Sequence, residues 1–374
     1  MGQRSHTSKI PSLDGIRALS FGIVFVAHAG LERWVPGGFG VTVFFFLSGF
    51  LITTLMREEH EKAGTIDFKA FYLRRALRIL PPFYLVLAAA TALCAAGVLG
   101  GELQPGAVAA QFAHFANYRA VSHGYTGQAL GTGVYWSLAV EEHFYLAFPL
   151  LFVVLQRLTA SGRQQALVLY ALCAVALGWR CWLVLGAGAA PDRTYLASDT
   201  RFDSILFGAA LAVHTNPASA RDAQPHPRWS LLLVPLAVAA LGVSFVWRNE
   251  VFRETARYTV QGLALIPLFS AAIRFPHWLP FRLLNLKPIA ALGLVSYSLY
   301  LVHHVVLFGV GRHLPGLPAP VQAVVALAIS LALSVTLYFA VEKPCAALRK
   351  RLSGPPAPES TWALRASPVA ERSS

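Results

Sequence analysis

The chain has 374 residues, of which 56% are hydrophobic and only 13% are charged, and its mean hydropathy is +0.54. Soluble domains carry about 25% charged residues, so this composition excludes an ordinary soluble protein and predicts an all-α integral membrane protein with several spans. The net charge of +13 does not require nucleic acid, because lysines and arginines in cytoplasmic loops of a membrane protein account for it.

The first apolar stretch, residues 13–31, contains three ionisable residues: Asp14, Arg17 and His28. Charges inside a span are costly and indicate a functional site by default. Arg17 and His28 are separated by about three turns of a regular helix, so we expect them on nearly the same face, about 16 Å apart along its axis. The structural alternative is an arginine that reaches the membrane surface and a histidine bound to a neighbouring carbonyl.

The same stretch also resembles a cleavable signal peptide, because basic residues precede an apolar run and Ala27-His28-Ala29 has the form of a cleavage motif. Asp14 and Arg17 interrupt the usual transition from the basic to the apolar region, and apolar stretches continue beyond it. We therefore expect this span to be retained.

Ten apolar stretches predict ten transmembrane helices, and the sixth is short for a span. They are residues 13–31, 38–56, 77–99, 136–156, 165–187, 202–214, 229–247, 258–274, 289–310 and 320–341. With the N-terminus inside, the inner segments hold 20 of the 31 lysines and arginines and the outer segments hold seven. This bias predicts that both termini are cytoplasmic.

The second and third spans carry the next candidate residues. The entry of span two is rich in glycine, and Ser48-Gly49 allows close approach of another helix, so Ser48 either packs between helices or lines a cavity. Arg75 and Arg78 lie one turn apart before span three, on the predicted inner side. Guanidinium pairs bind phosphates in a bidentate manner, whereas the alternative is an ordinary cluster that binds lipid headgroups.

Ionisable residues also enter the fourth, sixth and ninth spans. Glu141 and Glu142 lie at the start of span four, where one could face solvent and the other could point inward to orient an imidazole or hold a hydroxyl. The alternative is favourable placement near a helix N-terminus. Arg201 and Asp203 are expected to neutralise each other, and His303 lies mid-span, where an imidazole needs a partner.

The four cysteines show no metal-ligand spacing, so we expect free packing residues and no metal site. They are Cys94, Cys173, Cys181 and Cys345. Residues 1–344 are expected to form one transmembrane domain. The Pro-, Ser- and Ala-rich stretch at 345–374 is expected to be a disordered cytoplasmic tail.

Six motifs in this order make the chain resemble the membrane-bound acyltransferase family three, which includes bacterial O-antigen and exopolysaccharide O-acetylases. They are LDGIRAL followed by His28, GGFGVTVFFFLSGFLIT at 37–53, FYLRRALRILP at 71–81, YWSLAVEEHFY at 135–145, TRFDSILFG at 200–208 and SYSLYLVH at 296–303. Two features differ from the family pattern: Thr42 stands where an acidic residue is common, and no hydrolase-like domain follows the spans, so we expect an enzyme that acts alone or with separate partners.

The resemblance implies transfer of an acyl group, usually acetyl, from cytoplasmic acyl-CoA to a hydroxyl of a cell-surface or lipid-linked glycan. It implies a multi-pass protein of the bacterial inner membrane, with acyl-CoA as a co-substrate and no permanently bound cofactor. Arg17, Arg75 and Arg78 would bind acyl-CoA, and His28 would be the general base. We expect Glu142, or Glu141, to orient His28, and Asp14, Ser48, Arg201, Asp203 and His303 to support the site.

Two other functions remain open at this stage. The same chemistry could acylate a small molecule such as a macrolide or a glycolipid. Alternatively, Asp14, Arg17, His28 and Asp203 could form the path of a proton-coupled transporter. Transporters often have repeated halves, and the chain contains no second copy of the first-span or FYLRR pattern, which argues against that class. The oligomeric state is not indicated by the sequence.

Overall fold

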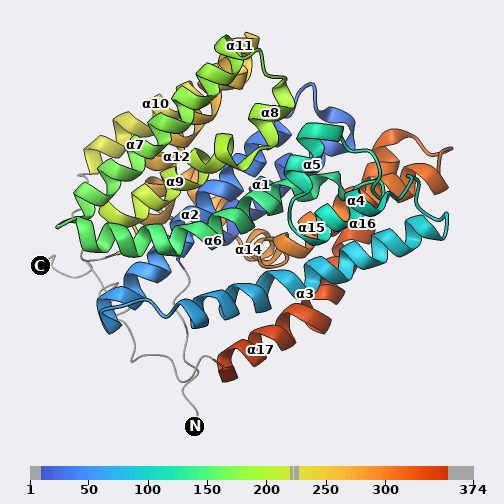
Figure 1. The fold of residues 1–374 in the computed structure, drawn as a ribbon, viewed down its shortest axis with the longest axis horizontal. Helices are drawn as coiled ribbons and strands as arrows, with labels where there is room; N and C mark the ends of the chain where they lie inside the picture. Colours follow the sequence, from blue (N-terminus) through green and yellow to red (C-terminus); the bar gives the residue numbers. More distant parts are fainter. Residues whose placement is uncertain (1–9, 220–221, 223–226, 353–374) are drawn as a thin grey trace, which may run out of the picture.

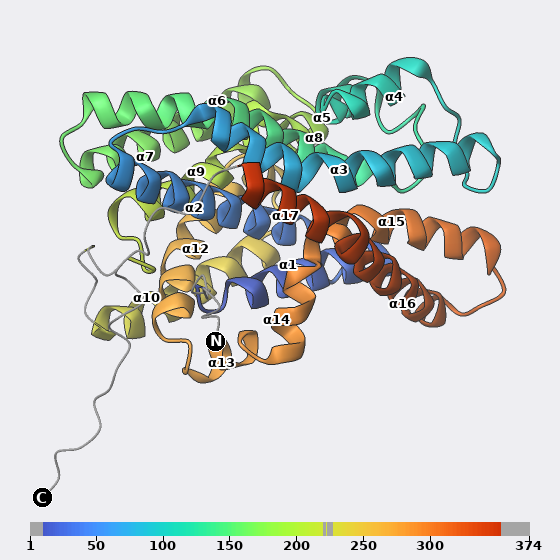
Figure 2. The same ribbon diagram turned by 90° about the horizontal axis from the view of Figure 1, so that it is seen from below.

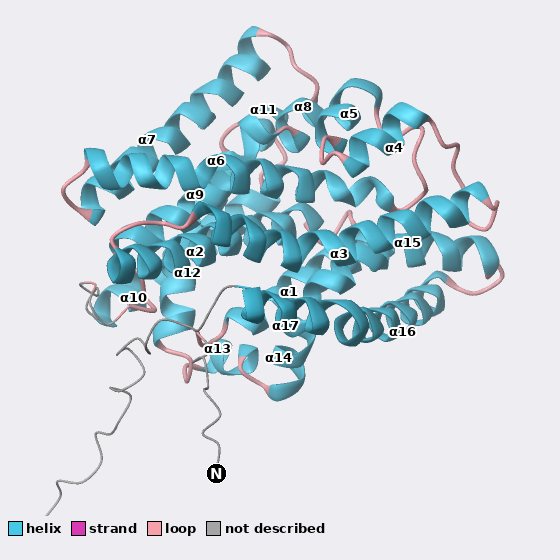
Figure 3. Cartoon of the chain, turned by 60° about the horizontal axis from the view of Figure 1, so that its bottom comes forward, coloured by secondary structure: helices cyan, strands magenta, loops and turns pink. Residues whose placement is uncertain are grey.

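The computed structural model describes residues 10–219, 222 and 227–352, and this part of the chain contains helices and no strands (Figure 3). The long helices are α1 (Leu13–Val26), α2 (Gly37–Ala63), α3 (Phe68–Ala95), α6 (Trp136–Leu158), α7 (Gly162–Cys181), α9 (Ser198–His214), α10 (Pro227–Val246), α12 (Arg257–Arg274), α15 (Ser296–His313) and α16 (Ala319–Leu337). The predicted all-α polytopic architecture is confirmed.

Shorter helices join these long ones. The α-helical connectors are α4 (Pro105–Phe112), α5 (Ala116–His123), α8 (Pro191–Leu196), α11 (Glu250–Glu254), α13 (Leu279–Leu284), α14 (Lys287–Leu294) and α17 (Lys343–Leu352). Single turns of other helix types are η1 (Ala27–Leu31), η2 (Thr132–Tyr135), η3 (Trp182–Gly186) and η4 (Tyr338–Glu342). The segment 100–135, between the predicted third and fourth spans, contains three of these short helices, α4, α5 and η2.

Seven helices within the described ranges are long and apolar enough to cross a bilayer, and an eighth span is possible if α14 and α15 act as one. These two helices meet at an angle of 73°, so the predicted ninth span is bent rather than straight. The predicted sixth and eighth spans correspond to α9 and α12, which are helical but are not among the helices that length and composition alone select.

Helix α9 lies at the centre of the bundle, packed between α2 and α7 (Figure 1). Of its 17 residues, 14 are buried, so it faces other helices on all sides. Helix α16 is the opposite case: it lies at the periphery (Figure 2), and its buried positions are Ala326, Ser330 and Ser334. Apolar residues on its remaining surface suit contact with lipid.

Small residues bring α2 and α9 into backbone contact. A Cβ atom added at Gly49 would collide with the carbonyl oxygen of Ile205, and one added at Gly208 would collide with the carbonyl oxygen of Phe46. Only glycine fits where two helix backbones approach this closely. The close approach expected from Ser48-Gly49 is thus present, and its partner is the centre of α9.

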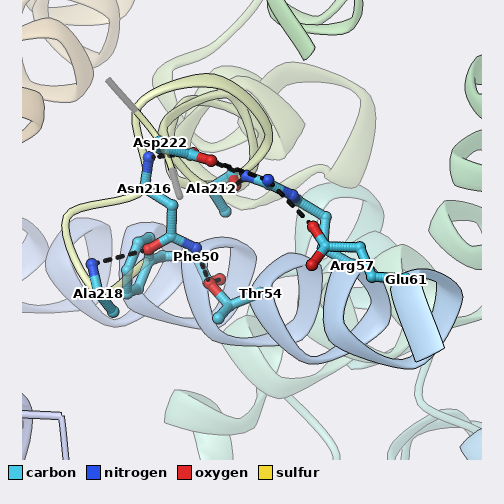
Figure 4. Close-up of polar contacts among 8 residues, drawn as sticks. All are labelled: Phe50, Thr54, Arg57, Glu61, Ala212, Asn216, Ala218 and Asp222. Carbon is cyan, nitrogen blue, oxygen red and sulfur yellow. Dashed lines mark hydrogen bonds and ion pairs between the residues drawn. The ribbon is translucent and has the colours of Figure 1, made fainter. Parts of the chain in front are cut away.

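Polar contacts fasten the end of α2 to the end of α9 and the segment after it (Figure 4). Arg57 donates to the carbonyl oxygen of Ala212 at 2.8 Å and pairs with Asp222 at 2.8 Å. Asn216 donates to Thr54 Oγ1 at 2.9 Å. Because one guanidinium binds both a carbonyl and a carboxylate, the two helix ends are held in a fixed register.

The sequence predicted one regular helix over the first span, but the structure divides this span into two parts. Helix α1 ends at Val26, and the next five residues form the π-helical turn η1, which contains His28. Gly30 then takes a φ of 101°, a conformation that favours glycine. The wider turn changes the direction of the side chains that follow Val26.

Buried charges are partnered differently from the prediction. Asp203 pairs with Arg180 of α7 at 2.7 Å, and both side chains are fully buried. Arg201 instead donates to Thr42 Oγ1 at 3.1 Å, and its guanidinium lies 4.2 Å from the centre of the Tyr258 ring. The expected Arg201–Asp203 pair is therefore wrong. Arg201 also donates to the carbonyl oxygen of Tyr195 at 3.1 Å.

All four cysteines are free, as expected. The first residues of the predicted tail, 345–352, form most of helix α17. The remainder of that tail, 353–374, lies outside the described residues.

Replacing Gly208 with alanine is expected to lower the free energy of unfolding by about 1–3 kcal/mol, because the new methyl group overlaps the backbone of α2. The matched control is Gly178→Ala in α7, where an added Cβ meets nothing within 4 Å. That change should be neutral or stabilising, because alanine favours helices. Thermal unfolding in detergent measures both; equal melting temperatures would contradict the close α2–α9 contact.

Replacing Asp203 with alanine is expected to cost about 3–5 kcal/mol of stability, because the buried Arg180 guanidinium loses its carboxylate. Asp199→Ala on the same helix removes a pair with Arg193 whose side chains are 24% and 38% exposed, and it should cost no more than about 1 kcal/mol. Chemical denaturation of the two variants compares them. A similar loss for both would show that burial does not set the strength of the Arg180–Asp203 pair.

Candidate active site

His28 is held by a chain of hydrogen bonds that starts on α15. His303 Nδ1 lies 2.8 Å from the carbonyl oxygen of Tyr300, and His303 Nε2 lies 3.0 Å from His28 Nδ1. His303 is fully buried, and its ring is nearly parallel to that of His28. The ring of His304 stacks on His28 as well, with centroids 4.4 Å apart.

These contacts fix which nitrogen of each neutral ring carries the proton. A carbonyl oxygen accepts only, so His303 Nδ1 must be the donor and its Nε2 an acceptor. His28 Nδ1 therefore donates to His303 Nε2, which leaves His28 Nε2 with a free lone pair. This tautomer of His28 can accept a proton from a group bound beside it.

His28 lines a cavity of about 460 Å³, which we call the histidine cavity. Its wall also includes Glu32, Trp136, Tyr195 and Arg257. Aromatic rings and charged groups from α6, α8, α12 and the segment after η1 thus line the same cavity as His28. Such a mixture of flat apolar surfaces and hydrogen-bonding groups is suited to a polar ligand with hydroxyl groups.

A second cavity, of about 120 Å³, contains the arginines predicted from the sequence, and we call it the arginine cavity. Its wall includes Arg17, Ser48, Arg75, Arg78, Glu141, Glu142, Tyr145, Tyr297 and Glu342. Arg17 pairs with Asp14 at 3.1 Å. Ser48 donates to Glu141 at 2.5 Å and lies 2.9 Å from the hydroxyl of Tyr145, so Ser48 lines a cavity rather than only packing between helices.

Tyr300 and Val41 line both cavities and form part of the wall between them. The Tyr300 hydroxyl lies 2.7 Å from Ser137 Oγ and donates to the carbonyl oxygen of Val134 at 3.1 Å. The backbone carbonyl of the same residue accepts from His303. One residue of α15 therefore both separates the cavities and begins the chain that orients His28.

The predicted site residues divide between these cavities. Arg17 and His28 line different cavities instead of one continuous path along a straight helix. Both Glu141 and Glu142 line the arginine cavity, and the hydrogen-bond partner of His28 is His303, not a glutamate. The residue that orients His28 in the structure is therefore His303, and the expected role of Glu141 or Glu142 in catalysis stays a prediction.

Sequence reasoning missed three residues of this arrangement: Tyr300, His304 and Glu32. The adjacency of His303 and His304 in an apolar span could have indicated His304, because paired imidazoles are costly there without a function. No comparable pattern marks Tyr300. Among the described residues, no group of three histidines, cysteines or acids is arranged to hold a metal ion.

Comparison with known proteins identifies relatives across the same stretch. The peptidoglycan O-acetyltransferase OatA of Listeria monocytogenes is 28% identical over 313 residues, which cover 79% of this chain and 49% of the relative. The O-acetyltransferase OatA of Staphylococcus aureus (strain NCTC 8325) is 29% identical over 316 residues, which cover 81% of this chain and 51% of the relative. The chain thus spans about half the length of these curated relatives. No solved structure matches it.

The family model described as "Acyltransferase domain" matches residues 10–339. This stretch includes α1 with Arg17, the η1 turn with His28, both glutamates, and the paired histidines of α15. The match covers most of the chain, the whole wall of the histidine cavity and the wall of the arginine cavity except Glu342, and the chain therefore belongs to this family of membrane acyltransferases.

Proposed function

We propose that the protein is a membrane O-acyltransferase that moves an acyl group, most simply acetyl, from acyl-CoA to a hydroxyl of a cell-envelope glycan. The observation that carries this proposal is the free lone pair at Nε2 of His28, a residue that lines a cavity separate from the one that holds the arginines. The names of the two relatives, both O-acetyltransferases, support the same reaction class.

The donor is assigned to the arginine cavity on chemical grounds. Acyl-CoA carries three phosphate groups, and guanidinium groups bind phosphate oxygens with paired hydrogen bonds. Arg75 and Arg78 have no ion pair to a carboxylate in the described part of the chain, so both are available to an anionic ligand. The slender pantetheine arm would then extend towards Tyr300 and carry the thioester to His28.

In the proposed reaction the acceptor hydroxyl lies in the histidine cavity and gives its proton to His28 Nε2. The hydroxyl oxygen forms a bond to the thioester carbonyl carbon, and the carbon–sulfur bond breaks. The proton then passes from His28 to the sulfur, so the products are an ester and free CoA thiol. Transfer through a covalent acyl-protein intermediate is an alternative order of the same bond changes.

The topology follows from this assignment and from the charge bias of the loops. We place the protein in the bacterial cytoplasmic membrane as a multi-pass protein with a cytoplasmic N-terminus. The arginine cavity would then receive acyl-CoA from the cytoplasm, and the histidine cavity would receive the glycan from the outer side. Membrane lipids would surround the exposed apolar faces of helices such as α16.

His28→Ala is expected to lower acetylation by about 10²–10⁴-fold, the usual contribution of a general base, while acetyl-CoA still binds.

His303→Phe should lower acetylation about tenfold or more, because His28 Nδ1 loses the acceptor that fixes its tautomer. His303→Gln should restore part of the rate, since its amide oxygen can accept the same hydrogen bond. The measurement is acetyl content of the envelope glycan, by mass spectrometry, in a null strain that expresses each variant.

The matched control is His304→Phe, which keeps a ring against His28 but removes no hydrogen bond to it. This variant should acetylate at close to the normal rate. The proposed role of His303 is contradicted if His303→Gln is as inactive as His303→Phe, or if His304→Phe is the more damaging change at equal protein levels.

Arg78→Ala is expected to weaken binding of acetyl-CoA about tenfold, because a guanidinium–phosphate contact is lost. Arg78→Lys should recover only part of the affinity, since an ammonium lacks the paired donors. Binding should also weaken as salt is raised, because charges exposed to solvent are screened. Calorimetry of the purified protein measures these affinities; wild-type affinity in Arg78→Ala would place the donor elsewhere.

A further inference from the structure

Helix α17 continues from the last span and lies against α3 (Figures 1 and 2). It begins next to the arginine cavity, because the preceding residue, Glu342, lines that cavity and accepts a hydrogen bond from Ser298 at 2.5 Å. The helix is strongly basic, with Lys343 at its start and Arg349, Lys350 and Arg351 in its last turn. A basic helix thus crosses the outside of the helix that carries Arg75 and Arg78.

The three basic residues of the last turn are not equivalent. Arg349 is half-buried, whereas Lys350 and Arg351 are exposed. Residues two apart on a helix point about 200° from each other, so Arg349 and Arg351 face nearly opposite directions. Arg349 is the one in electrostatic contact with the arginines of α3, namely Arg74, Arg75 and Arg78.

This cluster holds more positive charge than its neighbours balance. Arg74 is paired with Glu59 at 2.6 Å. Arg75 lies over the rings of Phe71 and Tyr145, and neither Arg78 nor Arg349 has a carboxylate within ion-pair distance in the described part of the chain. Arg78 has favourable charge–charge interactions with the carboxylates of Glu141 and Glu342. Arg349 instead has unfavourable ones with the guanidinium groups of Arg74 and Arg78. Like charges gathered in this way favour binding of an anion.

We propose that Arg349, together with Arg78, forms a phosphate site at the mouth of the arginine cavity and that it takes the outermost phosphate of the donor, the 3′-phosphate on the ribose of CoA. This inference rests on the proposed function. Arg75 and Arg78 line the cavity and Arg349 does not. Because Arg349 lies outside the cavity, on a helix packed against α3 and close to the charges of Arg74 and Arg78, we place there the end of the donor that stays outside while the pantetheine arm enters.

The same phosphate chemistry is present in anionic lipid headgroups, and basic residues at a membrane surface often bind them. A bound anionic lipid would also neutralise the positive charge of this arginine cluster, and it would do so without any role in donor binding. The two possible ligands of Arg349, the donor and an anionic lipid, can be distinguished. If Arg349 binds the donor, removal of the 3′-phosphate weakens donor binding; if Arg349 binds a lipid, this removal has no effect that depends on Arg349.

The test is binding of acetyl-CoA and of 3′-dephospho-acetyl-CoA to the full chain in nanodiscs of phosphatidylcholine, with and without phosphatidylglycerol. Wild type should bind the dephosphorylated donor about tenfold more weakly than acetyl-CoA. Arg349→Ala should bind acetyl-CoA more weakly than wild type does, by up to about tenfold, and should discriminate less between the two donors, because Arg78 alone is then left to bind the 3′-phosphate. The affinity of Arg349→Lys for acetyl-CoA should lie between those of wild type and Arg349→Ala, because lysine keeps the charge but lacks the paired N–H donors of arginine.

Arg351→Ala is the matched control, since it removes the same charge from the opposite side of α17, and it should bind both donors as wild type does. An unchanged melting temperature for Arg349→Ala would show that α17 stays in place; if it falls, Arg349→Lys alone carries the comparison. The inference is overturned if Arg349→Ala weakens both donors equally, or if its effect appears only when phosphatidylglycerol is present. Wild type that binds neither donor would instead contradict the donor of the proposed function.

Discussion

An ionisable group inside a bundle of membrane-spanning helices needs a partner from another helix, because no water is available there to solvate it. This constraint accounts for the positions of the most buried polar side chains. Arg180 of α7 pairs with Asp203 of α9, and His28 bonds to His303 of α15. The first pair joins two successive long helices, whereas the second joins residues that lie 275 positions apart in the sequence. The polar groups therefore set the arrangement of the helices as well as the chemistry of the site.

Arg201 shows how the same requirement is met without a carboxylate. Its guanidinium is enclosed by the rings of Phe45, Trp136, Tyr195 and Tyr258 and donates to Thr42. Aromatic faces attract a cation and lose little by being buried, so an aromatic cage can replace a counter-ion. Three of these rings also line the histidine cavity. The buried cation thus helps to fix the shape of the cavity where we place the acceptor.

Tyr300 links the two halves of the proposed reaction. Its ring separates the cavities, and its carbonyl begins the hydrogen-bond chain to His28. A thioester that moves past this ring would therefore arrive beside the imidazole that is already in the reactive tautomer. Because the hydrogen bond to His303 holds His28 in this tautomer, little reorganisation of the imidazole would be needed before reaction.

Local features were predictable from the sequence, and long-range pairings were not. Apolar length gave the long helices, small residues gave the contact at Gly49, and ionisable residues within spans gave Arg17, His28, Arg75 and Arg78. The partner of His28 lies 275 residues away, and a single sequence contains no signal that joins the two. The π-helical turn at His28 was also missed, since no proline or polar break precedes it. The paired carboxylates at the start of a span suggested that a glutamate orients His28, whereas in the structure the hydrogen-bond partner of His28 is His303.

The central claim is that the two cavities open to opposite sides of the membrane, and labelling of single cysteines tests it most directly. In a chain with its four cysteines replaced, Trp34→Cys places a thiol at the histidine cavity, where Trp34 is 83% exposed. Lys350→Cys places one on the exposed side of α17. With an impermeant maleimide added to intact cells, the account predicts labelling at position 34 and labelling at position 350 only after lysis. Labelling of both positions from the same side would contradict it.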